Sequence, residues 1–313
     1  STLLVCTYFP TFANIKSGQI GALLFFLVTL GWLFFRESKT QLAGFFWGIA
    51  FSIKLFVGLF LILLITQKKW GALKTFLITT TVCILIGLLI FTPETYFNYT
   101  LGFKAIEWYS SSWNASLLGF FSRLFGYQNE QNVSLIHCST LTPIFYLLSS
   151  AFLLVSFLFF KKDDRLTTDL AISYTLIAML LISPLGWMYY FSLLFIPFAI
   201  IFYWNQQLFH SLWINIFLSL AVFCSSAPYL LLKPGQITSP INIFLHSDIY
   251  FFALCLLTLL IFYLNWQRTG NANLMQHKSI KMEYLTITLF STAILPSFLG
   301  ILQITHLIFT SKL

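Results

Sequence analysis

The chain has 313 residues, of which 58% are hydrophobic and only 8% are charged, with a mean hydropathy of +0.86. A soluble domain of this length could not bury so much apolar surface, so we expect an all-α, multi-pass integral membrane protein. The net charge of +8 does not indicate nucleic-acid binding, because Lys and Arg lie in short clusters between apolar runs. The dispersed cysteines and histidines have no metal-binding spacing, and no cofactor is indicated.

The chain opens with a short apolar piece, Leu3–Phe12, which cannot span a membrane and lacks the basic start of a signal peptide. We interpret it as the end of a helix in an N-terminally truncated chain. Apolar runs of about the length that a membrane span needs follow it. They lie near Ile20–Phe35, Thr75–Phe91, Leu141–Phe160, Thr168–Leu185, Met188–Trp204, Ser211–Leu231, Ile249–Trp266 and Tyr284–Phe309.

A further apolar run, Leu42–Ile65, carries Lys54 near its middle, where an ammonium group costs roughly 2.5–3.5 kcal/mol on insertion scales. Two half-length helices meeting near Lys54 would place eleven Lys and Arg inside and five outside, whereas one crossing gives six and ten. The positive-inside rule favours the hairpin, with one crossing as the alternative. The inside set of the hairpin is Arg36, Lys39, Lys68, Lys69, Lys74, Lys161, Lys162, Arg165, Arg268, Lys278 and Lys281.

The substantial non-membrane segment is Thr92–Thr140, which this topology places outside as an extracytoplasmic loop within a single transmembrane domain of residues 1–313. It contains two acidic residues, Glu94 and Glu107, and an amphipathic piece, Ala115–Phe125. We expect that piece to be a helix in the interface plane. Its expected lipid-facing residues are Leu117, Phe120, Phe121 and Leu124.

Four polar features interrupt the apolar pattern, all on the side expected to be external. The first is Asn14 with Gly18 and Gln19, which either binds a ligand or forms a helix entrance. The second is Lys54, which either snorkels or is paired within the protein, or else binds an anionic ligand. A compact ammonium with three donors suits a phosphate, so we favour the binding of an anionic ligand.

The third feature is the segment from Trp113 through Asn114 to Ser116, and the fourth runs from Ser183 to Tyr190. The third is also readable as a helix cap with an interfacial Trp. The fourth, with Trp187, is either an aromatic belt or a stacking surface for a sugar. Together the four features describe an outward-facing cavity that holds an anionic headgroup beside an aromatic-lined polar site.

The order Asn-x3-Gly-Gln, an apolar run starting Leu-Ala-Gly and containing a lysine, Asn-x-Ser-Leu and Ser-Pro-x-x-Trp resembles glycosyltransferase family 87. That family consists of GT-C-type integral membrane enzymes, including polyprenyl-phosphate-mannose-dependent α-1,2-mannosyltransferases. The likeness covers roughly residues 10–205. The matching residues are Asn14, Gly18, Gln19, Leu42, Ala43, Gly44, Lys54, Asn114, Ser116, Leu117, Ser183, Pro184 and Trp187.

Two departures from the family pattern stand out. Val57 occupies a position where the family often has proline, three residues after the lysine, and Met188 follows the tryptophan where histidine is common. GT-C enzymes also carry a catalytic carboxylate in the first external loop. The resemblance therefore implies an acidic base upstream of Ser1, with Glu94 or Glu107 as a weaker substitute.

The resemblance implies an inverting transfer of mannose or another hexose from a polyprenyl-phosphate donor to a glycan or glycolipid acceptor. We expect this reaction on the outward face of the bacterial plasma membrane, with Lys54 stabilising the departing phosphate. A transporter or flippase for a lipid-linked sugar is the alternative, and a structural membrane subunit is a third possibility. The expected substrate-binding residues are Lys54, Gln19, Asn14, Asn114, Ser116, Trp187 and Tyr190.

Overall fold

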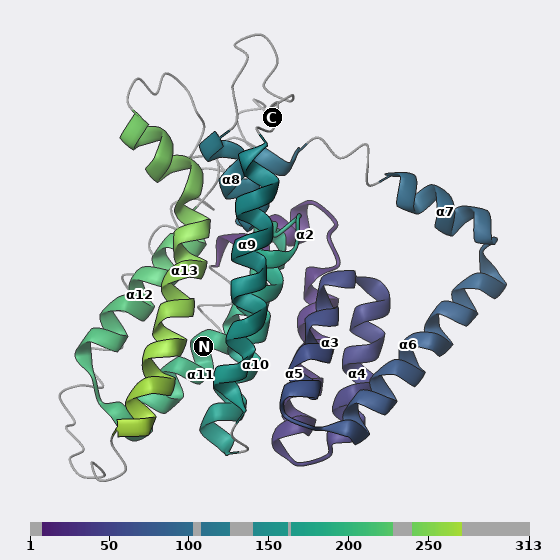
Figure 1. Cartoon of the computed structure of the whole chain (residues 1–313), viewed down its shortest axis with the longest axis horizontal. Coiled ribbons are helices and arrows are strands. Elements are labelled where there is room, and N and C mark those ends of the chain that lie inside the picture. Colours follow the sequence, from purple (N-terminus) through teal and green to yellow (C-terminus); the bar gives the residue numbers. More distant parts are fainter. Residues whose placement is uncertain (1–7, 103–107, 126–139, 162–163, 228–239, 271–313) are drawn as a thin grey trace. The chain divides into compact units, whose positions relative to one another are not determined.

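The computed structural model describes residues 8–102, 108–125, 140–161, 164–227 and 240–270 (Figure 1). Within these ranges the regular structure is helical. The β-type pairing found there is an isolated antiparallel bridge between Asn114 and Trp187. The prediction of an all-α membrane protein is confirmed, whereas the GT-C-like arrangement and the single domain stay predictions. The chain forms two compact units. The first unit comprises Ser1–Ala22, Ser112–Ala115 and Gly186–Leu313, and the second comprises Leu23–Ser111 and Ser116–Leu185.

Five helical segments among the described residues are long and apolar enough to cross a membrane, and each overlaps a predicted span. The prediction was accurate at both ends of Leu141–Phe160, and the last predicted span, Tyr284–Phe309, lies outside the described residues. The helix at Trp70 starts five residues earlier than expected. The five segments are Trp70–Ile90, Leu141–Phe160, Arg165–Ile182, Met188–Phe209 and Asp248–Gln267.

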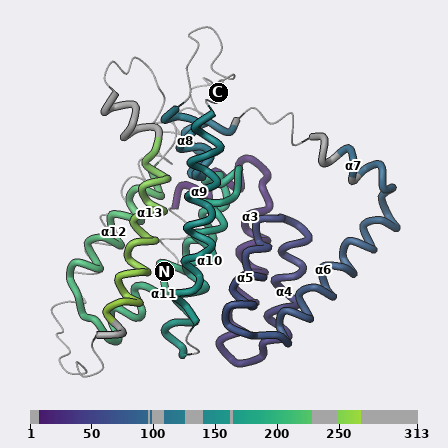
Figure 2. Tube along the Cα trace, in the orientation of Figure 1, coloured from purple at the N-terminus to yellow at the C-terminus, as the bar shows by residue number. Residues whose placement is uncertain are grey.

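The N-terminal half of the second unit begins with helices that reverse direction one after another as far as Ile90 (Figure 2). Its third helix is preceded by a short 3₁₀ segment that directly follows Lys54. These elements are α3 (Gly21–Arg36), α4 (Thr40–Ile53), the 3₁₀ helix η1 (Leu55–Gly58), α5 (Leu59–Thr66), α6 (Trp70–Ile90) and α7 (Pro93–Gly102).

The apolar run is interrupted at Lys54, as the hairpin requires. Lys54 ends α4 in an extended conformation, with φ −142° and ψ 118°, and its N–H still donates to the Ala50 carbonyl at 3.0 Å. The break forms although Val57 replaces proline, and the Val57 N–H donates to the Lys54 carbonyl at 3.1 Å. Thr40 and Lys69, which flank the run on its two sides, line one cavity, so the chain returns to the side from which it started.

Helices α4 and α6 run parallel and approach each other closely through small residues. Gly44 and Gly48 form a Gly-x3-Gly pair on α4. A Cβ at Gly44 would collide with the Ala72 carbonyl of α6, and one at Gly48 would lie 2.8 Å from the Phe76 carbonyl. Such backbone proximity is typical of helix pairs in membranes, where association depends on van der Waals packing.

Trp47 is the centre of the core formed by α3, α4 and α5. Its indole N–H donates to the Val28 carbonyl at 3.2 Å, and its ring stacks on Phe60 with centroids 4.0 Å apart. The same indole lies against Gly31, where a Cβ would collide with the ring. One fully buried aromatic residue therefore holds three successive helices together.

The C-terminal half of the second unit contains the predicted amphipathic helix, α8. Phe121 packs on Phe145 of α9 with ring centroids 5.6 Å apart, and Leu124 is exposed as expected. Leu117 is only 7% exposed, so the expectation that it faces lipid is wrong, because the helix buries that end against the protein. The elements are α8 (Leu117–Phe125), α9 (Leu141–Ser156), the 3₁₀ helix η4 (Phe157–Phe160) and α10 (Arg165–Ile182).

The first unit is built from a short N-terminal helix and the helices that follow Gly186. Tyr8, just before the first of these helices, packs on Phe195 with centroids 5.0 Å apart. Tyr250 of α13 donates to the Ala227 carbonyl, which ties α13 to the end of α12. The elements are α2 (Phe9–Lys16), the 3₁₀ helix η5 (Met188–Leu194), α11 (Phe195–Trp204), the π-helix η6 (Asn205–Phe209), α12 (Leu212–Ser226) and α13 (Pro240–Gly270).

Candidate functional site

The first predicted feature forms the end of α2. Gly18 adopts a left-handed conformation, φ +63°, which a residue without a Cβ reaches without strain. The Gly18 and Gln19 N–H groups donate to the carbonyls of Ile15 and Asn14 at 3.1 and 3.0 Å, so the last carbonyls of the helix are satisfied. The feature therefore terminates one helix, and the expected helix entrance begins only at Gly21.

The third and fourth features are joined through the Asn114–Trp187 bridge, although they lie about seventy positions apart in sequence. The Ala115 N–H donates to the Gly186 carbonyl at 2.9 Å, and the Met188 N–H donates to the Trp113 carbonyl at 3.0 Å. Asn114 is fully buried. Helix α10 ends at Ile182, before the predicted end at Leu185, because the residue before Pro184 is driven out of the helical region.

The first feature is joined to the fourth by Asn14. Its side-chain Nδ2 donates to the Tyr189 carbonyl at 2.8 Å. Gly21 makes this approach feasible, since a Cβ there would collide with Asn14 and lie 2.6 Å from the Tyr189 carbonyl. Asn14, Asn114, Trp187 and Tyr189 thus form one connected group within the first unit, which we call the amide–indole cluster.

The amide–indole cluster carries polar groups but no charge. The Trp187 side chain is partly exposed, and its indole N–H has no hydrogen-bond partner among the described residues. Two other predicted site residues are close to the cluster in sequence. Gln19 is half-buried and Tyr190 is buried. Burial also raises the pKa of the Tyr8 phenol, so this group stays protonated. The partly exposed Trp187 ring offers an aromatic face of the kind that suits a sugar, whereas the amide of Asn14 donates to Tyr189 and Asn114 is buried.

Two of the predicted site residues belong to the second unit. Lys54 is half-buried at the break between α4 and η1. Ser116 is buried and caps α8: its Oγ accepts from the Gly119 N–H at 3.0 Å and donates to the Pro184 carbonyl at 3.2 Å. The Ser116 hydroxyl is thus engaged in holding α8.

The structure does not connect either of the two carboxylates considered as substitute bases, Glu94 and Glu107, with the amide–indole cluster within the described residues. Glu94 is exposed in the first turn of α7, where its charge favours the helix N-terminus. Glu107 lies outside the described residues. Among the residues that the structure does describe, no three His, Cys, Asp or Glu side chains are close enough to hold a metal ion.

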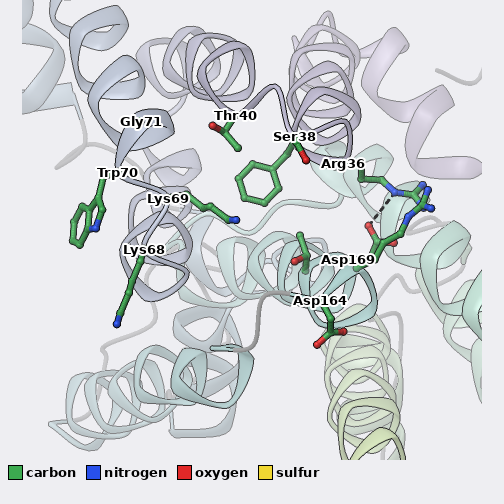
Figure 3. Close-up of a pocket in the computed structure, with 12 residues that line it drawn as sticks. Arg36, Ser38, Thr40, Lys68, Lys69, Trp70, Gly71, Asp164 and Asp169 are labelled. Atoms are coloured by element: carbon green, nitrogen blue, oxygen red, sulfur yellow. Dashed lines mark ion pairs between the residues drawn. The ribbon is translucent and has the colours of Figure 1, made fainter. Parts of the chain in front are cut away.

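A charged group that the sequence did not reveal lies in the second unit (Figure 3). Asp169 of α10 is 1% exposed, and its Oδ1 accepts from the Trp32 indole at 3.1 Å and lies 3.3 Å from Arg36 Nε. The Arg36 guanidinium also lies over the Trp32 ring, 5.3 Å from its centroid. A lone acid within a predicted span was the available signal, but nothing in the pattern indicated its partners.

The comparison with protein families agrees with the motifs. The model of glycosyltransferase family 87 matches residues 1–184, a stretch that includes Asn14, Lys54 and Asn114, whereas Trp187 and Tyr190 lie beyond it. No curated protein and no solved structure matches the chain. Since the match covers more than half of the sequence, the chain belongs to glycosyltransferase family 87 and is an integral membrane glycosyltransferase.

Proposed function

We propose that the protein transfers a hexose, mannose in the first instance, from a polyprenyl-phosphate donor to a glycan or glycolipid acceptor. Membership of a glycosyltransferase family supports the reaction class. The observation that carries the proposal is the amide–indole cluster, in which Asn14, Asn114 and Trp187 come together from three distant motifs. Neutral donors and an aromatic face are suited to a sugar, whereas an ion-transport site would need charged or carbonyl ligands.

In this proposal the acceptor hydroxyl oxygen attacks the anomeric carbon from the face opposite the lipid phosphate. The carbon–oxygen bond to the phosphate breaks, the phosphate leaves with the electron pair, and the hydroxyl proton passes to a general base. Inversion follows from this single displacement. We assign the base to none of the described residues.

Lys54 is the proposed partner of the departing phosphate. A helix break exposes polar backbone groups that must be satisfied within protein or a wet cavity, so such breaks in membrane helices accompany binding sites. An ammonium at this position gains strength as charge develops on the leaving group, because the surroundings have a low dielectric constant. Gln19, Asn114 and Trp187 would position the donor or the acceptor through hydrogen bonds and stacking.

The proposed sidedness rests on charge. Arg36, Lys39, Lys68, Lys69 and Lys74 lie in or beside the turns that join α3 to α4 and α5 to α6. The positive-inside rule places these turns on the cytoplasmic side, and Lys54 follows α4, whose 14 residues lead away from them. We therefore propose that Lys54 faces the extracytoplasmic half of a bacterial plasma membrane.

A transporter or flippase is the competing function for a lysine at membrane depth. Family membership favours the transferase, because the matched stretch contains Lys54 together with Asn14 and Asn114. A transporter would move the intact lipid-linked sugar, whereas a transferase releases the polyprenyl phosphate. The fate of a doubly labelled donor therefore separates the two functions.

The test is sugar transfer from radiolabelled polyprenyl-phosphate mannose in membranes that contain the full-length protein. We expect Lys54→Met to lower the transfer rate roughly 100-fold, the scale on which the loss of one preorganised charge-stabilising donor is felt. Lys54→Arg keeps a positive charge and should retain a measurable part of the rate. Lys74→Met is the matched control, since Lys74 is an exposed lysine on α6.

Each outcome of this assay has a definite consequence. Absence of transfer with mannose and with the other common polyprenyl-phosphate hexoses contradicts the proposed function. An undiminished rate in Lys54→Met removes Lys54 from the mechanism. Thermal unfolding of each purified variant, followed by tryptophan fluorescence, shows whether a lost rate reflects a lost fold.

A further inference from the structure

The second unit contains a cavity of about 800 Å³ that has no part in the proposed sugar transfer. It lies where the α3–α4 turn, the α5–α6 turn and the start of α10 meet (Figure 3). Its volume is within the usual range for small-molecule sites. The lining residues are Phe35, Arg36, Ser38, Thr40, Lys68, Lys69, Trp70, Gly71, Asp164, Arg165, Thr168 and Asp169.

The two turns have the same geometry and bring two helix starts to this cavity, where the start of α10 also lies. Ser38 and Lys68 both adopt left-handed conformations, with φ 62° and 55°, and end α3 and α5. The next N–H in each turn, from Lys39 and Lys69, donates to a carbonyl five residues back at 2.9 Å. The following helices begin at once, so the positive ends of α4, α6 and α10 are all near the lining.

Cations outnumber acids in the lining. Arg36, Lys68, Lys69 and Arg165 give four positive charges against two carboxylates, a formal net charge of +2. Figure 3 shows the Lys69 side chain pointing toward the middle of the lining residues, whereas Lys68 lies at the edge. No hydrogen bond or ion pair is found for the Lys68 or Arg165 side chain within the described part of the chain.

Both carboxylates already serve the protein itself. Asp164 caps α10: its Oδ1 accepts from the Thr167 N–H at 3.0 Å and its Oδ2 accepts from the Thr167 hydroxyl at 2.9 Å. Asp169 is held by Trp32 and Arg36. The acids therefore fix the walls, and the lining as a whole keeps its net positive charge.

We propose that this cavity binds a phosphate group, carried either by an anionic lipid headgroup or by a soluble phosphate. Two lysines and an arginine supply charge-assisted donors, and the hydroxyls of Ser38 and Thr40 add neutral ones. Basic pockets at the cytoplasmic ends of membrane helices suit lipid phosphates in this way. Trp70, 59% exposed at the mouth, has the amphipathic ring that suits the headgroup level.

This site is independent of the proposed transfer site. The cavity adjoins the first residue of α4, and Lys54 follows the last residue of the same helix. At 1.5 Å per residue the 14 residues of α4 separate the two by about 20 Å, so one phosphate cannot contact both. Loss of the cavity ligand and loss of sugar transfer are consequently distinguishable.

The experiment uses the full-length protein, stripped of lipid and placed in phosphatidylcholine nanodiscs. Phosphatidylglycerol is titrated into the discs, and native mass spectrometry counts the lipids retained by the protein. We expect Lys68→Gln with Lys69→Gln to weaken phosphatidylglycerol retention about tenfold or more, since two charge-assisted donors are lost. Lys74→Gln removes the same kind of charge from α6 outside the cavity and should leave retention within about twofold.

A second arm measures binding of radiolabelled inorganic phosphate to the same discs without phosphatidylglycerol. Phosphatidylglycerol retention that depends on Lys68 and Lys69, without phosphate binding, identifies a lipid ligand. Lysine-dependent binding of inorganic phosphate identifies a soluble one. Equal binding of both ligands by the wild type and by the Lys68→Gln/Lys69→Gln variant, or no binding by the wild type, overturns the proposal.

Lysine acetylation of the wild-type protein keeps the test independent of how the variants fold. Phosphatidylglycerol or phosphate should slow acetylation of Lys69 severalfold while Lys74 reacts at its original rate. Equal protection of both lysines, or protection of neither, contradicts a ligand in the cavity. Mass spectrometry of the digested protein gives the two rates from one sample.

Discussion

Helices α6 and α10 of the second unit were both expected to span the membrane, yet the protein uses them in opposite ways. Helix α6 is the more apolar of the two, but only 17% of its membrane-spanning stretch is buried within the protein. In α10 the buried share of that stretch is 89%. The buried residues of α6 lie in the part that faces α4, and Figure 2 shows the helix running on from that contact toward α7. In α10 nearly every residue from Leu166 to Leu181 is buried.

The difference shows that hydrophobicity does not decide which helix is central. Lipid tails solvate an apolar side chain as well as another helix does, so packing and polar contacts determine placement. Helix α10 carries Asp169, Ser173 and Thr175 in its interior. The two hydroxyls donate to the carbonyls of Asp169 and Ala171 at 2.9 and 2.7 Å, four residues back on the same helix, so their burial leaves no donor unsatisfied.

The strongest test of this contrast replaces the buried acid of α10. We expect Asp169→Ala to lower the free energy of unfolding by about 3 kcal/mol, because it removes the carboxylate that faces Arg36 and the Trp32 indole. Lys74→Ala, which removes an exposed charge from α6, should change it by less than about 0.5 kcal/mol. Unfolding of the purified protein in mixed micelles measures both. Similar effects would mean that α10 has no special structural role.

A leucine in each helix gives the next test. Leu176 of α10 is fully buried and Leu85 of α6 is 53% exposed. We expect Leu176→Ala to cost about 2 kcal/mol through the cavity it leaves, whereas Leu85→Ala, on a lipid-facing surface, should be nearly neutral. The same micelle unfolding assay compares the pair. A large effect at Leu85 would show that α6 packs against protein along that face.

The smallest expected effect concerns the contact between α4 and α6. Gly44→Ala should destabilise the protein by about 1–2 kcal/mol, because the new Cβ meets the Ala72 carbonyl, which belongs to the backbone and cannot easily yield. Gly71→Ala is the matched control, since its nearest neighbour would be 3.9 Å away. The thermal unfolding temperatures of the two variants measure the difference, and we expect the lower temperature for Gly44→Ala. Equal values would contradict a close α4–α6 contact.

The candidate site was predicted in part. The sequence indicated Asn14, Asn114 and Trp187 as members of one polar face, and the structure connects them in the first unit. The sequence could not indicate that the connections run largely through backbone groups, because backbone hydrogen bonds leave no signature in residue type. Roles of these residues in substrate binding stay predictions.

The helix break illustrates a different limit. The distribution of Lys and Arg along the chain indicated a break near Lys54, and the break is present although Val57 replaces the proline of the resembled pattern. The ion pair of Arg36 with Asp169 was missed, as was the Trp32 indole bond to the same acid, which joins residues 137 positions apart. Contacts at such separations are set by which helices pack together, and apolar runs of similar composition do not specify that.

The sequence by itself determined the helical membrane class, the positions of five spans and the break at Lys54. The class and the spans are local properties, because the membrane requires apolar runs of fixed length, whereas the break follows from where Lys and Arg lie along the whole chain. Only the tertiary structure decided that α10 is interior while α6 is peripheral, and that two similar turns and one helix start enclose a basic cavity. Those outcomes depend on small residues at helix contacts and on pairs distant in sequence, whose energies arise only when the helices meet.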